Sequence, residues 1–352
     1  MHKTIAFIGS VGIPNRYGGF ESFIENVAPI MAKNNNTVYV TCYQGAYTEH
    51  YEDYENIKRI FIKLKANGPL SPLHDMLSFL KVFKKAKYII VLGVSAGPFF
   101  ALMRFLSYIH GNVIITNIDG VEWRRNKYSE LGKFILFVFD YFAQIFSNKI
   151  IYDNAELMVF IKKFFIKKSF FIPYSGDHVL KFMRSDIKPR MKTALTICRV
   201  EPENNIEMLI EGFLRSGFEK YVIIGNFKNS NYGITLFKKY ENESRIEMLN
   251  PIYDAEIVNN YRQSTCVYLH GHSVGGTNPS LVEMLFHDCA VFCYDCNFNR
   301  ATAGERAHYF SSCEGLKGLI DNINYANISD FNYLNKDYFA DNIAGKYLEL
   351  MN

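Results

Sequence analysis

Short apolar runs of strand-like composition alternate with segments of helical period along the whole chain. In the first half, strands are predicted at residues 5–8, 38–42, 59–62, 88–92, 113–117, 149–152 and 169–172. Helices are predicted between most of them, at residues 20–31, 73–84, 98–109, 131–146 and 155–164. Alternation of this kind predicts parallel sheets that carry helices on both faces.

The same alternation restarts after a turn-rich stretch at residues 172–178 and a predicted linker at residues 188–192. Further strands are predicted at residues 194–198, 221–224, 245–248, 266–269 and 291–294, and further helices at 206–215, 235–240, 255–262, 280–286 and 337–350. We therefore expect one Rossmann-like domain over residues 1–178, a second over residues 179–334, and a helix within residues 335–352 that returns to the first domain. The expected fold class is α/β, with two doubly wound domains that face a central cleft.

The stretch from His270 to Glu283, with the sequence HGHSVGGTNPSLVE, is the strongest candidate for a ligand-binding segment. After its glycines, Asn278 and Pro279 are typical of an N-cap and of the first position of a helix. Backbone N–H groups and the positive end of a helix favour an anion at such a turn. Glu283, one turn inside the helix, is placed to accept hydrogen bonds from hydroxyls next to a bound phosphate. A plain strand-to-helix turn with a solvated Glu283 is the alternative interpretation.

A second glycine-rich turn follows the first predicted strand, in the sequence GSVGIPNRYGGFESF. Gly18 and Gly19 directly precede a helix, and a backbone without β-carbons there can approach a phosphate or a sugar ring closely. A dehydrogenase fingerprint fits badly, because Gly9 and Gly12 do not have the G-x-G-x-x-G spacing.

Two more segments follow predicted strands and carry polar side chains. In ICRVEPENNIEML, Arg199 is a candidate to neutralise a diphosphate, unless it is a surface arginine paired with a neighbouring glutamate. In TNIDGVEWRRNKYSE, Asp119 is a candidate to orient an acceptor hydroxyl. Candidate contacts to an acceptor sugar or its phosphate are Trp123, Arg124 and Arg125. Structural roles are the alternative here: Asp119 as the cap of a turn, and Trp123 as a core residue.

Charge divides unevenly between the two halves of the chain. Residues 1–190 hold 25 Lys and Arg against 15 Asp and Glu, a balance of +10, whereas residues 191–352 hold 14 against 20, a balance of −6. Lysines are interleaved with phenylalanines at residues 81–87 and 162–171, a mixture that is expected at an anionic bilayer surface. A solvated basic face is the alternative. Nucleic acid is not an expected partner, because no nucleic-acid-binding motif accompanies the charge.

The composition is that of a folded globular protein, with 49% hydrophobic and 21% charged residues in a chain of 352. The longest apolar segment, residues 134–146, is too short to span a membrane and is expected to be a buried or interfacial helix. No signal peptide is predicted, so the expected location is the cytoplasm, in agreement with cysteines in strand-like runs. A metal site at Cys289, Cys293 and Cys296 is disfavoured, because no fourth ligand has suitable spacing.

Three segments together, GIPNRYGGFE, the Arg199 segment and HSVGGTNPSLVE, resemble the bacterial rhamnosyltransferase-type branch of glycosyltransferase family four, which has the GT-B fold. In that family an arginine and a lysine hold the donor diphosphate, and two glutamates eight residues apart hold the sugar and the ribose. Arg199 and Glu283 match two of these positions. Asn204 stands where the lysine is usual, and Gly275 stands where the first glutamate is usual.

The resemblance implies a retaining hexosyltransferase of surface polysaccharide synthesis, for O-antigen or capsule. Its leading donor is dTDP-L-rhamnose, with a UDP-hexose such as UDP-galactose or UDP-glucose as the alternative. Its acceptor is a lipid-linked, polyprenyl diphosphate saccharide on the inner face of the cell membrane. No D-x-D motif occurs, so neither a metal ion nor another cofactor is expected. The resulting candidates are, for the donor, Gly18, Gly19, Arg199, Asn204, Gly275, Gly276, Thr277, Asn278, Ser280, Leu281 and Glu283; for the acceptor, Arg16, Glu122, Trp123 and Arg124; and for catalysis, Asp119 and Arg199.

Two other classes of protein stay open from the sequence. A GT-B nucleotide-sugar epimerase would use the same phosphate-binding turn and would convert its donor without an acceptor. A non-catalytic homologue would bind a nucleotide sugar without turnover, which is conceivable because Asn204 and Gly275 replace the usual contacts.

Overall fold

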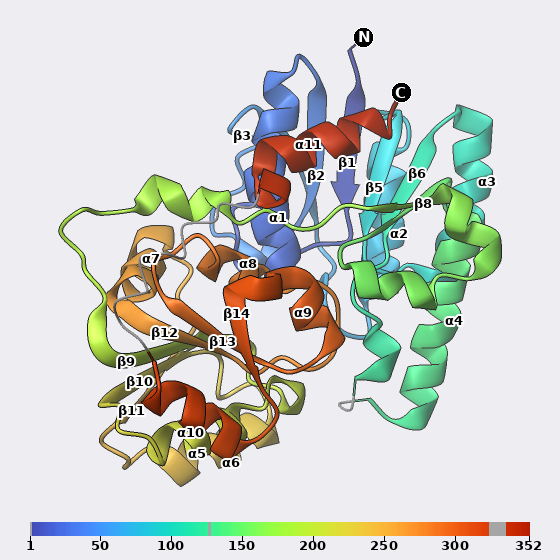
Figure 1. The fold of residues 1–352 in the computed structure, drawn as a ribbon. Coiled ribbons are helices and arrows are strands. Elements are labelled where there is room, and N and C mark those ends of the chain that lie inside the picture. The colour runs from blue at the N-terminus through green and yellow to red at the C-terminus, as the bar shows by residue number, and fades with distance from the viewer. Residues whose placement is uncertain (1, 126–127, 324–335) are drawn as a thin grey trace. The chain divides into compact units, whose positions relative to one another are not determined.

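The computed structural model describes residues 2–125, 128–323 and 336–352, which divide into two compact units (Figure 1). Unit 1 comprises Met1–Ser175 together with Asp337–Asn352, and unit 2 comprises Gly176–Lys336. Each unit is built on one largely or wholly parallel sheet with helices packed on it. Two α/β units of this kind are what the alternating pattern predicts.

Unit 1 contains a sheet of eight strands in the order β3-β4-β2-β1-β5-β6-β7-β8. All pairings are parallel except that of β3 with β4. The strands are β1 (Thr4–Ile8), β2 (Thr37–Tyr43), β3 (Asp53–Tyr54), β4 (Ile57–Ile62), β5 (Tyr88–Leu92), β6 (Val113–Asn117), β7 (Lys149–Tyr152) and β8 (Ser169–Phe171).

The central strands of unit 1 are buried on both faces, which explains their continuous apolar sequences. In β1, Ile5 and Phe7 belong to one core cluster, whereas Ala6 and Ile8 belong to another on the opposite face. The helices of unit 1 are α1 (Gly19–Lys33), α2 (Ser71–Val82), α3 (Phe100–His110), α4 (Glu130–Phe146) and α11 (Ala340–Glu349).

The last helix of the chain, α11, belongs to unit 1 and lies beside α1 (Figure 1). Ile343 and Tyr347 are fully or almost fully buried in the same core cluster as Phe23 of α1, and the rings of Phe23 and Tyr347 are 5.4 Å apart. Lys3 donates a hydrogen bond to the backbone oxygen of Leu348 at 3.2 Å. Both chain ends are therefore attached to the same unit.

Unit 2 contains a wholly parallel sheet of six strands in the order β11-β10-β9-β12-β13-β14. Its strands are β9 (Arg190–Ile197), β10 (Lys220–Ile224), β11 (Ile246–Leu249), β12 (Thr265–His270), β13 (Ala290–Tyr294) and β14 (Ala307–Phe310). Its helices are α5 (Ile206–Leu214), α6 (Asn231–Tyr240), α7 (Ala255–Ser264), α8 (Pro279–Met284), α9 (Asn297–Ala303) and α10 (Cys313–Asp321).

Several local predictions were wrong. The helix expected at residues 155–164 is instead two short 3-10 helices, η4 (Ala155–Phe160) and η5 (Lys163–Lys168). They are separated by Ile161 and Lys162, whose backbone is extended. The linker expected at residues 188–192 overlaps the start of β9. Strands β3 and β14 and helices α9 and α10 were not predicted. No described helix is long and apolar enough to cross a membrane.

Candidate functional site

The predicted donor residues of unit 2 lie on two loops that follow neighbouring strands. Arg199 and Asn204 belong to the loop between β9 and α5, and residues 271–278 form the loop between β12 and α8. Because β9 and β12 are paired in parallel, their carboxyl ends bring both loops to one edge of the sheet. Ligands of doubly wound sheets bind at this edge. Arg199 is exposed there, whereas most of its neighbours along the loop are at least partly buried.

The side chain of Asn204 joins the two loops. Its Nδ2 donates to the backbone oxygen of Arg199 at 2.6 Å, and its Oδ1 lies 2.7 Å from Nδ1 of His272. Asn205 adds a second link, because its Nδ2 donates to the backbone oxygen of Gly271 at 2.7 Å. Both ends of the Asn204 amide are thus used within the protein, and Asn204 is buried. In this structure its role is to hold the loops in register.

At two positions of the second loop, the backbone geometry favours glycine over residues with a side chain. A Cβ on Gly271 would lie 2.1 Å from the backbone oxygen of Asn204, so only glycine permits this approach of the loops. Gly275 has a φ of +126°, which residues with a side chain rarely adopt. The glutamate that is usual at position 275 in the resembled family would be strained in this conformation, which gives a physical reason for the departure.

The first turn of α8 is capped by a neutral side chain, as the sequence predicts. Asn278 accepts a hydrogen bond from the backbone N–H of Ser280 at 3.1 Å, and Pro279 occupies the first helical position. The Ser280 hydroxyl donates to the Asn278 side-chain oxygen at 2.8 Å and accepts from the Tyr268 hydroxyl at 3.0 Å. However, α8 has only six residues, so its dipole is small and backbone N–H groups of the loop carry most of the attraction for an anion.

The remaining predicted donor residues of this segment differ in accessibility. Gly276 is partly buried, and Thr277 is buried. The Leu281 side chain is fully buried, and its N–H donates to the backbone oxygen of Asn278 at 3.0 Å. In this structure Leu281 therefore anchors α8 in the core and presents no side chain at the surface.

Glu283 is held in a buried cluster of charged and titratable side chains. Its Oε2 accepts a hydrogen bond from Nη2 of Arg262, and its Oε1 lies 3.2 Å from Nε2 of His178. Glu283 and Arg262 are 6% and 7% exposed, respectively, so this is a buried ion pair. Burial alone would raise the pKa of the Glu283 carboxyl, but the Arg262 charge and the His178 hydrogen bond outweigh burial and hold this pKa below its usual value. Glu283 is therefore an anion at neutral pH.

Two buried histidines of unit 2 are held in the neutral form. Burial lowers the pKa of His270, the last residue of β12, to about 3. Burial and the Arg262 charge lower the pKa of His287 to about 3, although Glu283 acts in the opposite direction. Within the described residues, neither ring nitrogen of His287 has a hydrogen-bond partner. At neutral pH His287 therefore adds no positive charge beside Arg262 and Glu283.

In unit 1, the predicted glycine-rich turn leads directly into α1. Gly18 is the N-cap, and Gly19 is the first residue of the helix. Glu21, which is 3% exposed, folds back on the turn and accepts a hydrogen bond from the backbone N–H of Val11 at 2.7 Å. Arg16 is exposed at the tip of the turn. This turn therefore contains a buried acid that binds one of its own backbone N–H groups.

Asp119 follows β6 and has a φ of +54°, in the left-handed region. Its backbone N–H donates to Oδ1 of Asn117 at 3.0 Å, a turn of the kind that asparagine side chains form. Because non-glycine residues with positive φ are uncommon and cluster at functional sites, this conformation is compatible with the predicted role of Asp119.

The candidate acceptor residues near Asp119 pack against α4. Nε1 of Trp123 donates to Asp140 at 3.2 Å, and the Arg124 guanidinium lies 5.3 Å from the ring centre of Phe160. Glu122 forms an ion pair with Arg125 at 2.7 Å. Trp123 and Arg124 also line an open hollow of about 450 Å³, together with Glu130, Lys133, Phe134 and Phe137.

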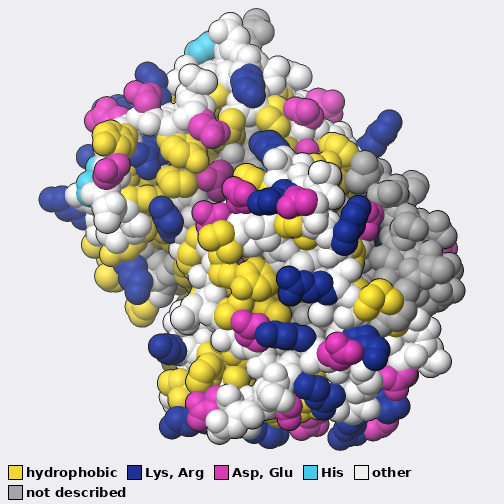
Figure 2. Space-filling model, turned by 90° about the vertical axis from the view of Figure 1, so that its left-hand side faces the viewer, with side chains coloured by type: hydrophobic (Ala, Val, Ile, Leu, Met, Phe, Trp, Pro, Cys, Tyr) yellow, Lys and Arg dark blue, Asp and Glu magenta, His cyan; other side chains and the backbone are white. Residues whose placement is uncertain are grey.

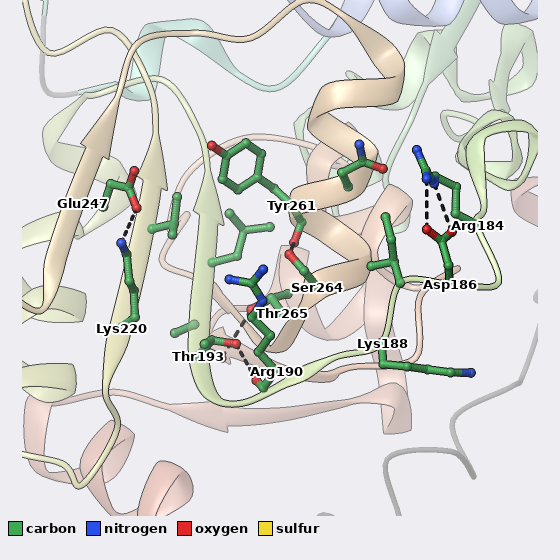
Figure 3. Close-up of a pocket in the computed structure, with 15 residues that line it drawn as sticks. Arg184, Asp186, Lys188, Arg190, Thr193, Lys220, Glu247, Tyr261, Ser264 and Thr265 are labelled. Atoms are coloured by element: carbon green, nitrogen blue, oxygen red, sulfur yellow. Dashed lines mark hydrogen bonds and ion pairs between the residues drawn. The ribbon is translucent and has the colours of Figure 1, made fainter.

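Another open pocket, of about 710 Å³, lies in unit 2 away from the predicted donor loops (Figure 3). It is lined by Arg190, Lys220 and Thr265, which begin strands β9, β10 and β12, so it lies toward the amino ends of these parallel strands. Two of its basic side chains are already paired: Lys220 with Glu247 at 2.7 Å, and Arg184 with Asp186 at 2.9 Å. The candidate donor residues lie at the opposite, carboxyl ends.

Sequence reasoning missed three side chains of these sites: Glu21, His178 and Arg262. A signal for Glu21 existed, because an acidic residue in the first turn of a helix often binds backbone N–H groups. No local pattern marks His178 or Arg262, since both act through Glu283, which lies 21 residues beyond Arg262.

Residues 2–177 match a protein-family model described as a domain of unknown function, DUF1972. The chain belongs to this family. The match covers half of this chain and most of unit 1, including the turn at Gly18 and the Asp119 segment. The chain matches no curated protein sequence.

Solved structures similar to this DUF1972 protein extend over both units. Sucrose-phosphate synthase from Thermosynechococcus elongatus has a TM-score of 0.75 at 13% identity, covering 99% of this chain and 98% of its own. A trehalose-phosphate synthase from Burkholderia xenovorans, in complex with glucose-6-phosphate, has a TM-score of 0.70 at 8% identity, covering 99% and 100%. HepE from Anabaena, in complex with UDP and glucose, has a TM-score of 0.68 at 11% identity, covering 99% of both chains. The predicted GT-B fold is thereby confirmed.

Proposed function

We propose that this protein is a GT-B hexosyltransferase that moves a sugar from a nucleotide donor to a lipid-linked saccharide. The leading donor is dTDP-L-rhamnose, on the resemblance of the sequence motifs, and a UDP-hexose is the alternative. The product is a surface polysaccharide, O-antigen or capsule, and the reaction takes place on the cytoplasmic face of the membrane.

The observation that carries this proposal is the joined pair of loops at the carboxyl edge of the unit 2 sheet. Exposed Arg199 provides a positive charge, and the loop before α8 is capped by the neutral Asn278. A guanidinium and backbone N–H groups are the contacts that bind a diphosphate. Glu283, an anion one turn further along, can accept hydrogen bonds from the free pentose hydroxyls of the nucleotide, which are two in a UDP donor and one in a dTDP donor.

The ligands of structural neighbours agree with this assignment. HepE from Anabaena is in complex with UDP-glucose in one structure and with UDP and glucose in another. A Burkholderia xenovorans neighbour is a UDP-forming trehalose-phosphate synthase. A nucleoside diphosphate sugar is thus the ligand class that we assign to unit 2.

The proposed reaction is dissociative and retains the anomeric configuration. As the sugar–phosphate bond lengthens, Arg199 and the N–H groups of the β12–α8 loop stabilise the negative charge that develops on the leaving diphosphate. Asp119 orients the acceptor hydroxyl, which attacks from the face that the diphosphate leaves; its oxygen replaces the diphosphate on the sugar, and its proton passes to the departing diphosphate. Because the sequence has no D-x-D motif, we assign the stabilisation of the diphosphate to Arg199 and not to a metal ion.

A lipid-linked acceptor is supported by an exposed apolar and basic surface in unit 1, formed by α3, α4, η4 and η5. Gln144 of α4 donates to the backbone oxygen of Phe160 in η4, and α3 packs on α4. Burial, together with the nearby charge of Arg104 on α3, lowers the pKa of Lys168 in η5 to about 8. These elements are therefore neighbours. The large apolar side chains that they expose are Leu102, Phe105, Tyr108, Ile109, Leu131, Phe134, Ile135, Tyr141, Met158, Val159, Phe164 and Ile166.

This exposed surface suits an anionic bilayer because apolar and basic side chains alternate on it. Phe164 is 93% exposed and is flanked by Lys163 and Lys167. Phenylalanine side chains insert at the boundary of the acyl chains, while lysines contact anionic headgroups. On the face of the molecule drawn in Figure 2, by contrast, basic and acidic side chains are interspersed. The candidate acceptor residue Arg124 lies against Phe160 of the same surface.

A donor panel tests the enzymatic part of the proposal. Release of nucleotide is measured from dTDP-L-rhamnose, UDP-galactose and UDP-glucose, with and without a polyprenyl diphosphate saccharide and with and without EDTA. We expect release that needs the acceptor and is unaffected by EDTA. Conversion of the donor sugar without an acceptor would show an epimerase, and binding without release on any acceptor would show a non-catalytic protein.

Vesicle sedimentation tests the membrane part. Wild-type protein should bind vesicles with a large anionic fraction and should detach as salt rises, because salt screens the lysine contacts. Phe164→Glu should lower the partition constant for these vesicles at least tenfold, since loss of one inserted apolar side chain removes about 1.5–3 kcal/mol. Tyr51→Glu is the matched control, because Tyr51 is 64% exposed in unit 1 but lies outside α3, α4, η4 and η5. Equal loss in both variants would contradict this surface.

A further inference from the structure

The buried cluster around Glu283 is assembled from three separate elements of unit 2. Glu283 lies on α8, Arg262 on α7, and His178 on the 3-10 helix η6 (Asp177–Phe182). One carboxylate oxygen of Glu283 accepts from Arg262, and the other lies 3.2 Å from Nε2 of His178. Each oxygen is thus held by a different element, so the plane of the carboxylate is fixed as well as its position.

Helix α7 holds both partners of Glu283 from one face. Arg262 comes from this helix, and Asn259, three residues earlier, donates its Nδ2 to the backbone oxygen of Phe182 at 3.0 Å. Residues three apart lie on the same side of a helix. The side chain of Asn259 therefore fastens η6, which carries His178, to the same face of α7 that presents Arg262.

The chain just before His178 is pressed directly onto α8. A Cβ on Gly176 would lie 2.8 Å from Cγ1 of Val282 and 2.9 Å from Cε2 of Phe286. Val282 directly precedes Glu283, so the segment that enters unit 2 packs on the very turn of α8 that carries the carboxylate. Only a residue without a side chain allows this approach, which leaves His178 within reach of Glu283.

The held carboxylate keeps part of its capacity to bind a ligand. An ionised carboxylate can accept about four hydrogen bonds, and Arg262 and His178 use two of these positions. The positive charge of Arg262 also stabilises the ionised form of this buried carboxylate. A hydroxyl that reaches Glu283 therefore finds acceptor positions that Arg262 and His178 do not use.

From this arrangement we infer that His178 and Arg262 are positioning residues, which orient the Glu283 carboxylate toward the free pentose hydroxyls of the nucleotide. This inference rests on the proposed function, because it takes the ligand of unit 2 to be a nucleotide. His178 and Arg262 contact Glu283 and not the nucleotide, so their effect on binding is transmitted through the orientation of one side chain.

The test compares nucleotides that have and lack ribose hydroxyls. Binding of UDP, dTDP, 2′,3′-dideoxy-UDP and 3′-deoxy-dTDP is measured by calorimetry on the full chain. His178→Ala should weaken binding of the hydroxylated nucleotide about tenfold, as expected for loss of one charge-assisted hydrogen bond at about 1.4 kcal/mol per factor of ten. Binding of the matching deoxy nucleotide should not change, because it has no hydroxyl for Glu283.

Conservative variants separate positioning from damage to the fold. His178→Gln keeps an N–H donor at similar reach and should restore most of the binding, whereas His178→Leu should behave as His178→Ala. His308→Ala is the matched control, since His308 is an exposed histidine of unit 2. The turnover number with saturating donor should change less than the KM for the donor, because Glu283 contacts the ribose and not the reacting bond.

Each result decides the matter. If His178→Ala weakens both kinds of nucleotide equally, or neither, the inference is overturned while the proposed function stands. If wild-type protein binds none of the nucleotides, the proposed function fails and this inference fails with it. A selective loss for the hydroxylated nucleotide, restored by His178→Gln, supports the inference.

Discussion

The two glycine-rich turns of this protein look alike in sequence but differ in where they keep a buried glutamate. In unit 1, Glu21 is the third residue of α1 and folds back to bind the backbone N–H of Val11. In unit 2, Glu283 is the fifth residue of α8 and is held away from the turn by Arg262 and His178. The unit 2 turn is capped instead by a neutral asparagine.

The difference gives a physical reason to assign the proposed diphosphate to the turn of unit 2. A carboxylate at a turn occupies backbone N–H groups and repels a second anion. Unit 1 has such a carboxylate, so Gly18 and Gly19 are better suited to a sugar ring than to a phosphate. Unit 2 neutralises its carboxylate with Arg262 and has Arg199 at the adjoining loop, so the turn stays open to negative charge.

The largest expected effect comes from removing the charge that holds Glu283. Arg262→Met should lower the free energy of unfolding by about 3–5 kcal/mol, because it leaves a buried carboxylate without its counter-charge. Urea unfolding of unit 2, followed by hydrogen exchange, measures this loss. The double variant Arg262→Met, Glu283→Leu should recover much of the stability. If the single variant were as stable as wild type, the ion pair would not be what separates the two turns.

The next effect concerns catalysis at the unit 2 turn. Arg199→Ala should lower turnover roughly a hundredfold or more, as expected for loss of a main contact to the charge of the transition state. Arg16→Ala, at the exposed tip of the unit 1 turn, should lower it less than tenfold. Steady-state kinetics with the active donor measures both. Equal losses would place the diphosphate as much at the first turn as at the second.

A contact of the site could be predicted from the sequence when its two residues lie close together along the chain, and could not when they lie far apart. The capped start of α8 was predicted well, because the signals of Asn278 and Pro279 are local and the Asn278 hydrogen bond reaches only two residues along the chain. The role of Asn204 could not be predicted, since its partner His272 is 68 residues away and is brought near by the pairing of β9 with β12.

Some elements of the fold could likewise be predicted from the local sequence, and others could not. Strands such as β1 and β5 were predicted closely because burial on both faces makes their sequences continuously apolar. The two-residue strand β3 and the short strand β14 have no such run, because half of the β14 residues are not buried. The single helix expected at residues 155–164 was wrong because helical periodicity does not reveal the extended residues at 161 and 162.

A further effect is expected from pH, and it should come from unit 2. His270 and His287 stay neutral in the folded protein until about pH 3, whereas in the unfolded chain a histidine takes up a proton near pH 6.5. The unfolded state therefore binds more protons between these values, and stability falls as pH falls from 6.5, by up to about 1.4 kcal/mol per unit for each histidine. Unfolding curves at pH 7 and pH 5 test this, and His287→Leu should make the dependence shallower.

The smallest effect should come from the acid of the unit 1 turn. Glu21→Gln keeps an acceptor for the Val11 N–H but removes its charge, which should cost about 1 kcal/mol and speed exchange of that amide hydrogen. Asn278→Ala is the counterpart in unit 2 and should cost a similar amount through loss of a cap. If Glu21→Gln left exchange at Val11 unchanged, the carboxylate would not be what closes this turn.

The position of α11 has a consequence for how the protein is made. Phe23 and its neighbours on α1 are covered by residues of α11 that leave the ribosome only after all of unit 2. Unit 2 spans residues 176–336, and at about 5–20 residues per second its synthesis takes on the order of 10–30 seconds. During that interval an apolar strip of the nascent first unit is uncovered, so the core around Phe23 can be completed only after the final helix has been made.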